Sequence, residues 1–523
     1  MSSIRKRFLF SAGANVARAA ISLAVGLLVA RGLGPTDYGN LAYLLGSFWA
    51  IRALLDMGSS SAFYTFIAQR GRDSHYYLVY FSWLAFQFLL SVALVTLLLP
   101  SAVIESFWLG QDRELILLAL LATFLQNQVW LTVVQMHEAE RKTIRIQVAG
   151  LFVILAHLVL VASILVSQWL SVRAVLWAIV GEYFVAAVWL SVRLRITEPP
   201  PSGVDGARDS LRSVILAYFR YCRPMAVIAV FSFGYEMADR WLLQRYGGAA
   251  QQGFYQVAAQ LSTISLLATS SILNIFWKEI AEANERGAHE RVAGLYLKTT
   301  QSLVFLAAGV TCFLAPWAEP LVNVLLGSAY QAAWPVLFLM LFYPIHQAIG
   351  QINGTLFMAT GRNSVYMRIT VTGLLVSIPV SYVLIAQDSA LGGVGLGLGA
   401  MGLALKILGL NFLFVNIQSW VISRYYGIQF QWRSQIGAIV ILLLIGYACK
   451  FSVDQLFAWI QPSFGASTRI GMLTGMIGAG LLYLGGVLMV LMLIPRFAGM
   501  TQHEVTGYLQ KIRNLGRLGR NER

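Results

Sequence analysis

The stretch "GLGPTDYGNLAYLLGSF", residues 32–48, joins two long apolar segments at roughly 10–30 and 41–67. Its glycines and proline indicate a turn between two helices. Further segments of about twenty apolar residues, enough to cross a hydrocarbon core of ~30 Å, recur along the whole chain of 523 residues. The sequence therefore predicts an all-α polytopic membrane protein.

Composition agrees with this fold class and excludes several others. The chain is 58% hydrophobic and only 12% charged, whereas soluble domains are about a quarter charged. The net charge of +15 could suggest nucleic acid, but most basic residues lie in the breaks between apolar segments. Membrane topology explains that placement, so no nucleic-acid partner is expected. The three cysteines are far apart and no nucleotide motif is present, so we expect neither a metal nor a cofactor.

Fourteen transmembrane helices can be segmented from the apolar pattern. The predicted spans are roughly 10–30, 41–67, 76–100, 114–136, 146–168, 171–193, 216–240, 252–277, 299–325, 334–358, 364–386, 391–418, 435–458 and 470–494. With the N-terminus placed inside, 28 of the 38 Lys and Arg fall on the inner side, 7 on the outer side and 3 within spans. This asymmetry predicts that both termini lie in the cytoplasm.

A Pro- and Gly-rich connection, "LRITEPPPSGVDGARDSLRS", divides the predicted spans into two groups. No extramembrane segment is long enough for a catalytic domain, so we expect a transporter and not an enzyme. The predicted domains are an N-terminal lobe at 1–193, a cytoplasmic linker at 194–215, a C-terminal lobe at 216–418, two further helices at 419–494 and a basic cytoplasmic tail at 495–523.

A second stretch, "YGGAAQQGFYQVAAQLS", resembles the first one. Each contains two glycines five residues apart, Gly34 with Gly39 and Gly248 with Gly253, at an offset of 214 residues. Duplication of a six-helix unit would give this offset and would keep both copies in the same orientation. Chance spacing of glycines is the alternative explanation.

The longer stretch "GLGPTDYGNLAYLLGSFWAIRALLDMGSSSAFYTFIAQR" resembles the amino-terminal signature of the polysaccharide transporter family. This family includes the Wzx-type O-antigen and lipid-linked oligosaccharide flippases of the multidrug/oligosaccharidyl-lipid/polysaccharide exporter (MOP) superfamily. The resemblance implies two six-helix lobes, a parallel pseudo-repeat around a central cavity, followed by two C-terminal helices. The matching residues are Gly34, Tyr38, Gly39, Asp56 and Gly58, then Asp239 and Arg240 before "GFYQVAAQL".

Two arginines, Arg18 and Arg52, lie midway along the first two predicted helices. A central arginine costs at least about 2.5–3.5 kcal/mol, so each should face protein or a watery cavity and have a partner. Asn15 lies one turn from Arg18, and Asp56 lies one turn from Arg52. These four residues are the predicted substrate-binding group, because a guanidinium suits a phosphate. A structural ion-pair cluster between the two helices is the alternative.

Carboxylates within spans are candidate coupling sites or counter-ions for Arg18. They are Glu182, Glu236 and Asp239. His157 is expected to be structural. Three consecutive amides at 126–128 cannot all face one way on a helix, so some should bond between helices.

These features predict a flippase that moves an undecaprenyl-diphosphate-linked oligosaccharide across the bacterial inner membrane by alternating access, for surface polysaccharide assembly. Its partners would be that glycan, membrane lipid and, as a further candidate, other polysaccharide assembly proteins. A multidrug cation antiporter of the same superfamily is one alternative, although it would favour an acidic cavity. A polytopic O-antigen polymerase or ligase is another, although it would need a larger outer loop.

Overall fold

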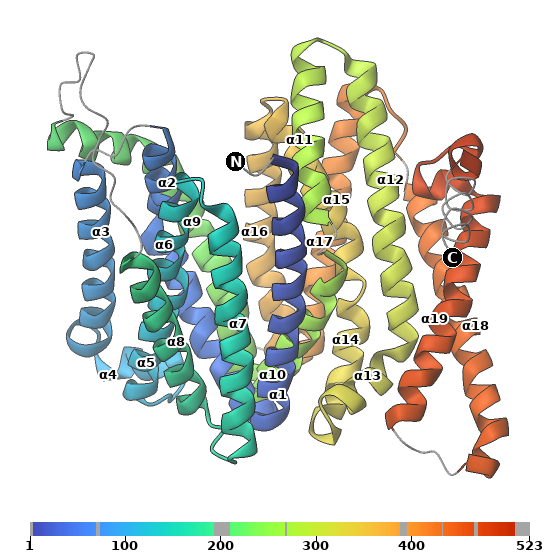
Figure 1. The fold of residues 1–523 in the computed structure, drawn as a ribbon, viewed down its shortest axis with the longest axis horizontal. Helices are drawn as coiled ribbons and strands as arrows, with labels where there is room; N and C mark the ends of the chain where they lie inside the picture. The colour runs from blue at the N-terminus through green and yellow to red at the C-terminus, as the bar shows by residue number, and fades with distance from the viewer. Residues whose placement is uncertain are drawn as a thin grey trace, which may run out of the picture. The chain divides into compact units, whose positions relative to one another are not determined.

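The computed structural model describes residues 4–69, 74–192, 210–266, 269–387, 395–430, 432–464 and 469–507, and every regular element in these ranges is a helix (Figure 1). The chain divides into two compact units. Unit 1 comprises Met1–Val257 and Leu374–Leu403, and unit 2 comprises Ala258–Gly373 and Ala404–Arg523.

Unit 1 is built from long helices joined by short turns. Its elements are α1 (Ile4–Asp56), α2 (Ser59–Gln69), α3 (Ser74–Ala93), η1 (Leu94–Leu98), α4 (Ser101–Trp108), α5 (Arg113–Phe124), η2 (Leu125–Val129), α6 (Trp130–Ala139), α7 (Thr143–Val166), α8 (Val172–Val192), α9 (Leu211–Leu242) and η3 (Leu243–Gly247), with part of α10 (Ala249–Ser262).

Unit 2 contains the remaining helices. They are η4 (Thr263–Leu266), α11 (Thr269–Glu285), α12 (His289–Leu314), η5 (Ala315–Trp317), α13 (Ala318–Leu325), η6 (Ser328–Ala333), α14 (Trp334–Met340), α15 (Tyr343–Ala359), α18 (Trp432–Phe464), α19 (Arg469–Leu493) and η7 (Pro495–Ala498). Three helices contribute residues to both units: α10, α16 (Asn363–Ile385) and α17 (Gly399–Tyr426).

The helices have the length and surface of membrane spans. In the described residues, eleven helices are long and apolar enough to cross a membrane, or twelve if the bent pair Ser328–Met340 and Tyr343–Ala359 is one span. Phe152 and Val159 of α7 and Leu481 of α19 are 65–68% exposed, as side chains that face lipid would be. The protein is therefore a polytopic membrane protein. The predicted number of fourteen spans is not confirmed.

Part of this difference in number comes from α1, which joins two predicted spans. Gly34 has φ 75° and ψ 170°, so two helices meet there at a kink. Glycine adopts this conformation without the steric penalty of a Cβ. Pro35 follows directly, and its fixed φ suits the first turn of the second helix.

The second predicted span, 41–67, is itself broken. Its helix ends at Asp56, and α2 begins at Ser59. The break follows from two residues with positive φ, Met57 at 47° and Gly58 at 84°. A left-handed residue cannot continue a right-handed helix, so the chain must begin a new one.

The predicted Gly-rich span 391–418 starts later than expected. α17 begins at Gly399, and residues 391–394 lie outside the described ranges. Before α17 the chain bonds back to the end of α16, with Leu396 N donating to Val383 O at 2.8 Å. A Cβ on Gly395 would lie 2.3 Å from the carbonyl oxygen of Ala386, so glycine permits this close non-helical approach.

The two glycine motifs have the same conformation and contact each other within unit 1. Gly248 has φ 83° and ψ 170°, close to the values of Gly34. A Cβ on Gly39 would lie 1.8 Å from the carbonyl oxygen of Ala249, and one on Gly253 would lie 2.2 Å from that of Pro35. Each contact maps onto the other at the offset of 214 residues. This symmetry supports the interpretation of the motifs as a repeat.

Candidate functional site

Arg18 is half-buried on α1 and is held by neutral oxygens. Its Nη2 group donates to Asn15 Oδ1 one turn earlier and to Gln147 Oε1 on α7, the latter at 2.9 Å. Gly150 makes room for the guanidinium, since a Cβ there would lie 2.8 Å from Nη1. The predicted pairing of Arg18 with Asn15 is present in the structure. Gln147 was not expected, because only packing brings residues 129 positions apart together.

No described carboxylate lies within ion-pair distance of Arg18. Glu138, at the end of α6, and Tyr183 of α8 interact with it electrostatically. Glu182 instead pairs with His157, whose Nδ1 lies 2.7 Å from Glu182 Oε1. The charge of Arg18 is therefore not neutralised by an ion pair with any described residue.

The remaining carboxylate candidates lie on α9. Glu236 interacts electrostatically with Arg240 and Asp239. Asp239 is buried, and Ser381 Oγ of α16 donates to its Oδ1 at 2.5 Å. A Cβ on Gly46 of α1 would overlap the Arg240 guanidinium. These residues belong to contacts of α9 with its neighbours, and none of them forms a described ion pair with Arg18.

Arg52 lines a small cavity of about 20 Å³ in unit 1, which is room for about one water molecule. Gln87 of α3 and Gln128 of η2 line the cavity, and Gln128 Nε2 donates to Gln87 Oε1 at 2.5 Å. Among the described residues, nothing accepts a hydrogen bond from the buried Arg52 Nε. Arg52 therefore retains donor capacity inside the bundle.

Asp56 forms the cap of α2 in the structure. Its Oδ1 accepts from Ser59 Oγ at 2.8 Å and from the Ser60 backbone N–H at 3.0 Å, and its Oδ2 accepts from Ser60 Oγ at 2.8 Å. Arg52 and Asp56 are both described, and their side chains form no ion pair within 4.0 Å. The predicted pairing of these two residues is therefore absent. The helix ends at Asp56, and its carboxylate points toward the free N–H groups of the next helix.

The three amides at 126–128 coincide with a π-helical turn, η2. Gln126 Nε2 donates to Tyr183 OH on α8 at 3.3 Å, while Gln128 bonds Gln87 on α3. The prediction that some of these amides bond between helices is confirmed. A π turn changes the direction of side chains within a helix and is frequent at functional sites. Here the π turn lets η2 form hydrogen bonds to both α3 and α8.

Solved structures with a similar fold are transporters. A structure entitled "Lipid II flippase MurJ, inward closed conformation" is 14% identical, covers 92% of this chain and 98% of its own, and has a TM-score of 0.63. An inward-facing multidrug resistance MATE family transporter of the MOP superfamily is 16% identical, with coverages of 78% and 95% and a TM-score of 0.54. A MOP superfamily transporter from Pyrococcus furiosus is 15% identical, with coverages of 81% and 96% and a TM-score of 0.52.

Sequence comparison supplies the family. No curated protein matches the chain. The sequence profile of the family described as "Polysaccharide biosynthesis protein" matches residues 28–335, which is more than half of the chain. The chain therefore belongs to this family of polysaccharide biosynthesis proteins, and its fold is that of a MOP superfamily transporter.

Proposed function

We propose that the protein is a flippase that moves an undecaprenyl-diphosphate-linked oligosaccharide across the bacterial inner membrane. The observation that carries this proposal is the state of Arg18. Both of its described hydrogen bonds leave from Nη2 and end on neutral amide oxygens. Its Nη1 and Nε groups make no hydrogen bond to a described residue, so each could donate a separate charge-assisted hydrogen bond to a phosphate oxygen.

Arg52 supports the same assignment. Its Nε is buried without a described partner beside a small cavity, and Asp56 is committed to α2. A buried donor without a partner is unfavourable, and an oxygen ligand would satisfy it. Arg18 would then compensate the desolvation of a diphosphate as it leaves the headgroup region, and Arg52, whose cavity has room for about one water molecule, would contact a single oxygen or a bridging water. Asn15 would orient Arg18, and Asp56 would fix the end of the helix that carries Arg52.

The family and the fold agree with this substrate class. The family profile is that of polysaccharide biosynthesis proteins. MurJ, whose fold is similar, is a flippase of lipid II. Transport would proceed by alternating access between two six-helix lobes, as the repeated glycine motifs suggest. The sugars would occupy an aqueous interior while the lipid tail stays in the bilayer.

The decisive variant is Arg18→Gln, which keeps hydrogen-bonding capacity and removes the charge. We expect binding of undecaprenyl diphosphate to the purified protein to weaken by about tenfold or more, because hydrogen bonds to a charged group contribute ~1.5–3 kcal/mol. Export of surface polysaccharide should fall in parallel in cells that depend on this protein. Arg52→Gln should act in the same direction.

Arg173→Gln is the matched control, because Arg173 lies on the surface of the same unit and pairs with Glu114 at 3.0 Å. Its protein level, binding and export should equal those of the unchanged protein. Normal export by Arg18→Gln at a normal protein level would refute the site. Uptake of organic cations without any movement of the lipid-linked sugar would refute the function and favour an antiporter.

A further inference from the structure

A polar cavity of about 760 Å³ lies in unit 2, where α18 begins and α19 has ended. Arg433 lines it from the first turn of α18, and Arg496 lines it from the turn after α19. Gln301 of α12 and Gln429 add amide groups, and no acidic side chain is among the described residues that line it. The cavity therefore combines two guanidinium groups with neutral hydrogen-bonding partners.

No acidic side chain among the described residues neutralises either arginine. The Arg433 guanidinium carbon lies 5.4 Å from the ring centroid of Trp432, and neither Arg433 nor Arg496 forms an ion pair with any residue that the structure describes. Two such cations on one cavity attract an anion that carries several oxygens.

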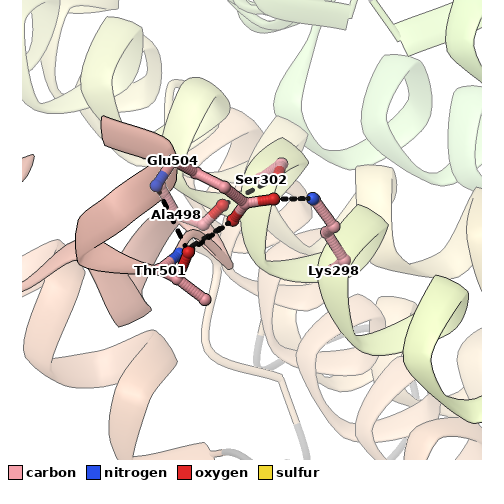
Figure 2. Close-up of polar contacts among 5 residues, drawn as sticks. All are labelled: Lys298, Ser302, Ala498, Thr501 and Glu504. Atoms are coloured by element: carbon pink, nitrogen blue, oxygen red, sulfur yellow. Dashed lines mark hydrogen bonds and ion pairs between the residues drawn. The ribbon is translucent and has the colours of Figure 1, made fainter. Parts of the chain in front are cut away.

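The segment that carries Arg496 is held firmly against α12 (Figure 2). Ser302 Oγ donates to the carbonyl oxygen of Ala498 at 2.7 Å. Thr501 N donates to Glu504 Oε2 at 2.9 Å, and Lys298 Nζ donates to Glu504 Oε1 at 2.6 Å. The carboxylate of Glu504 is thereby bound to Lys298 and the turn, and the guanidinium of Arg496 is left for a ligand.

A long apolar groove continues from the polar cavity. It has a volume of about 1090 Å³ and runs between α12 and α19, with Met500 lining both spaces. Lys298 and Ser302 line the groove from the middle of α12, and side chains such as Leu306 and Leu484 line its apolar length. Trp432 beside the cavity is a residue type enriched at the membrane–water interface. A cationic cavity that continues as an apolar groove fits an amphiphile with an anionic head.

We propose that Arg433 and Arg496 bind the phosphate of an anionic glycerophospholipid and that one acyl chain of this lipid lies in the groove between α12 and α19. The lipid would link the start of α18, the end of α19 and α12 without taking part in the substrate site of unit 1.

The test is a titration of phosphatidylglycerol into the full-length protein in detergent, with the lipid-bound mass followed by native mass spectrometry. Phosphatidylcholine serves as the zwitterionic comparison. We expect phosphatidylglycerol to bind more tightly than phosphatidylcholine. The double variant Arg433→Gln/Arg496→Gln should lose at least about tenfold in affinity for phosphatidylglycerol, since each basic residue near an anionic lipid contributes to the binding free energy. The double variant Arg433→Lys/Arg496→Lys should retain most of the affinity.

Arg424→Gln is the matched control, because Arg424 is exposed at the end of α17, stacks on Trp420 and does not line the cavity. It should bind phosphatidylglycerol normally, and all variants should unfold at the temperature of the unchanged protein. Equal binding of the two lipids, or normal binding by the double glutamine variant, would overturn the proposal. Displacement of the lipid by millimolar inorganic phosphate would also overturn it, because the cavity would then be a site for free phosphate.

Discussion

At the residue scale, the charged groups of unit 1 differ in how completely the protein satisfies them. Glu182 has His157 as a partner, whereas Arg18 has only amide oxygens. The sequence could show that an arginine in a span needs a partner, because the desolvation of a charge is unfavourable anywhere in a bilayer. It could not show that Gln147 is this partner, or that His157 pairs with Glu182, because those pairs depend on how α7 packs against its neighbours.

Glu182, Glu236 and Asp239 stay candidate coupling residues, and we propose Glu182 as the one to test first because it pairs with a titratable histidine, His157. Glu182→Gln keeps a polar side chain at the contact with His157 but cannot exchange a proton. We expect flipping by the purified protein in proteoliposomes to lose its stimulation by a proton gradient, while binding of undecaprenyl diphosphate is unchanged. Flipping is measured as the fraction of lipid-linked sugar that becomes accessible on the outer face.

Glu114→Gln provides the comparison, since Glu114 is an exposed carboxylate that pairs with Arg173 on the same unit. It should leave the response to the gradient intact. A normal response in Glu182→Gln would assign the pair with His157 a structural role only.

At the element scale, backbone breaks decide where helices begin and end. The apolar pattern predicts helices well, because backbone polar groups in lipid must bond within the helix. It does not reveal the break after Asp56 or the late start of α17, since both depend on glycines with positive φ. The glycine pairs were visible as a repeat in the sequence, but their mutual contact follows only from the packing of α1 against the start of α10.

Gly39→Ala and Gly253→Ala should both destabilise unit 1. Each added Cβ would meet a backbone carbonyl oxygen, Gly39 at 1.8 Å and Gly253 at 2.2 Å, and a backbone cannot move aside as a side-chain end can. Overpacking of this kind costs about 1–3 kcal/mol and sometimes more. Thermal unfolding of the purified variants in detergent measures the loss as a lower midpoint.

Gly181→Ala on α8 is the matched control, because its Cβ would meet nothing within 4 Å. Its midpoint should be unchanged or slightly higher, as alanine favours a helix. Unchanged midpoints for both Gly39→Ala and Gly253→Ala would show that the contact is not tight.

Docking of residues 495–507 onto α12 should depend on pH. Hydrogen bonds from Lys298 and Thr501 hold the pKa of Glu504 at about 2, below its ordinary value of 4.5. Because the docked state has the lower pKa, its stabilisation is complete above about pH 4.5 and is lost as the pH falls from there to about 2. The protection of this segment from hydrogen–deuterium exchange, measured relative to the intrinsic exchange rate at each pH, should therefore be high at neutral pH and fall in acid.

In Glu504→Gln the protection of the same segment, relative to the intrinsic exchange rate, should already be low at neutral pH and should change little with acid. Asp454→Asn removes a comparable surface pair with Lys450 on α18 and should leave the segment protected. Slow exchange in Glu504→Gln at every pH would mean that other contacts, such as Ser302 with Ala498, are sufficient for docking.

At the scale of the whole molecule, composition alone was enough to predict an all-helical membrane protein, and the family profile and the transporter folds agree with it. The number of spans was harder to predict, because α1 runs through one predicted turn. The orientation in the membrane rests on the distribution of Lys and Arg and stays a prediction.

Alkaline phosphatase fusions test this orientation, since the enzyme is active only outside the cytoplasm. A fusion after Arg523 should be inactive, and one at Gly110, between α4 and α5, should be active. A fusion in the turn at Gly361, between α15 and α16, should match the inactive one. The reverse pattern would invert the topology and would place the arginine cavity of unit 2 on the outer side.

The contact between Gly39 and Gly253 also restricts how the gene can vary. Any single-nucleotide change in a glycine codon that alters the amino acid introduces a side chain with a Cβ. At both positions that Cβ would clash with a backbone oxygen of the other motif. A second substitution that changes a neighbouring side chain cannot relieve this clash, because a backbone atom makes it. If the two motifs descend from one ancestral segment, Gly39 and Gly253 had to remain glycine because of this contact, and the positive φ of Gly34 and Gly248 favours glycine at a second position of each copy.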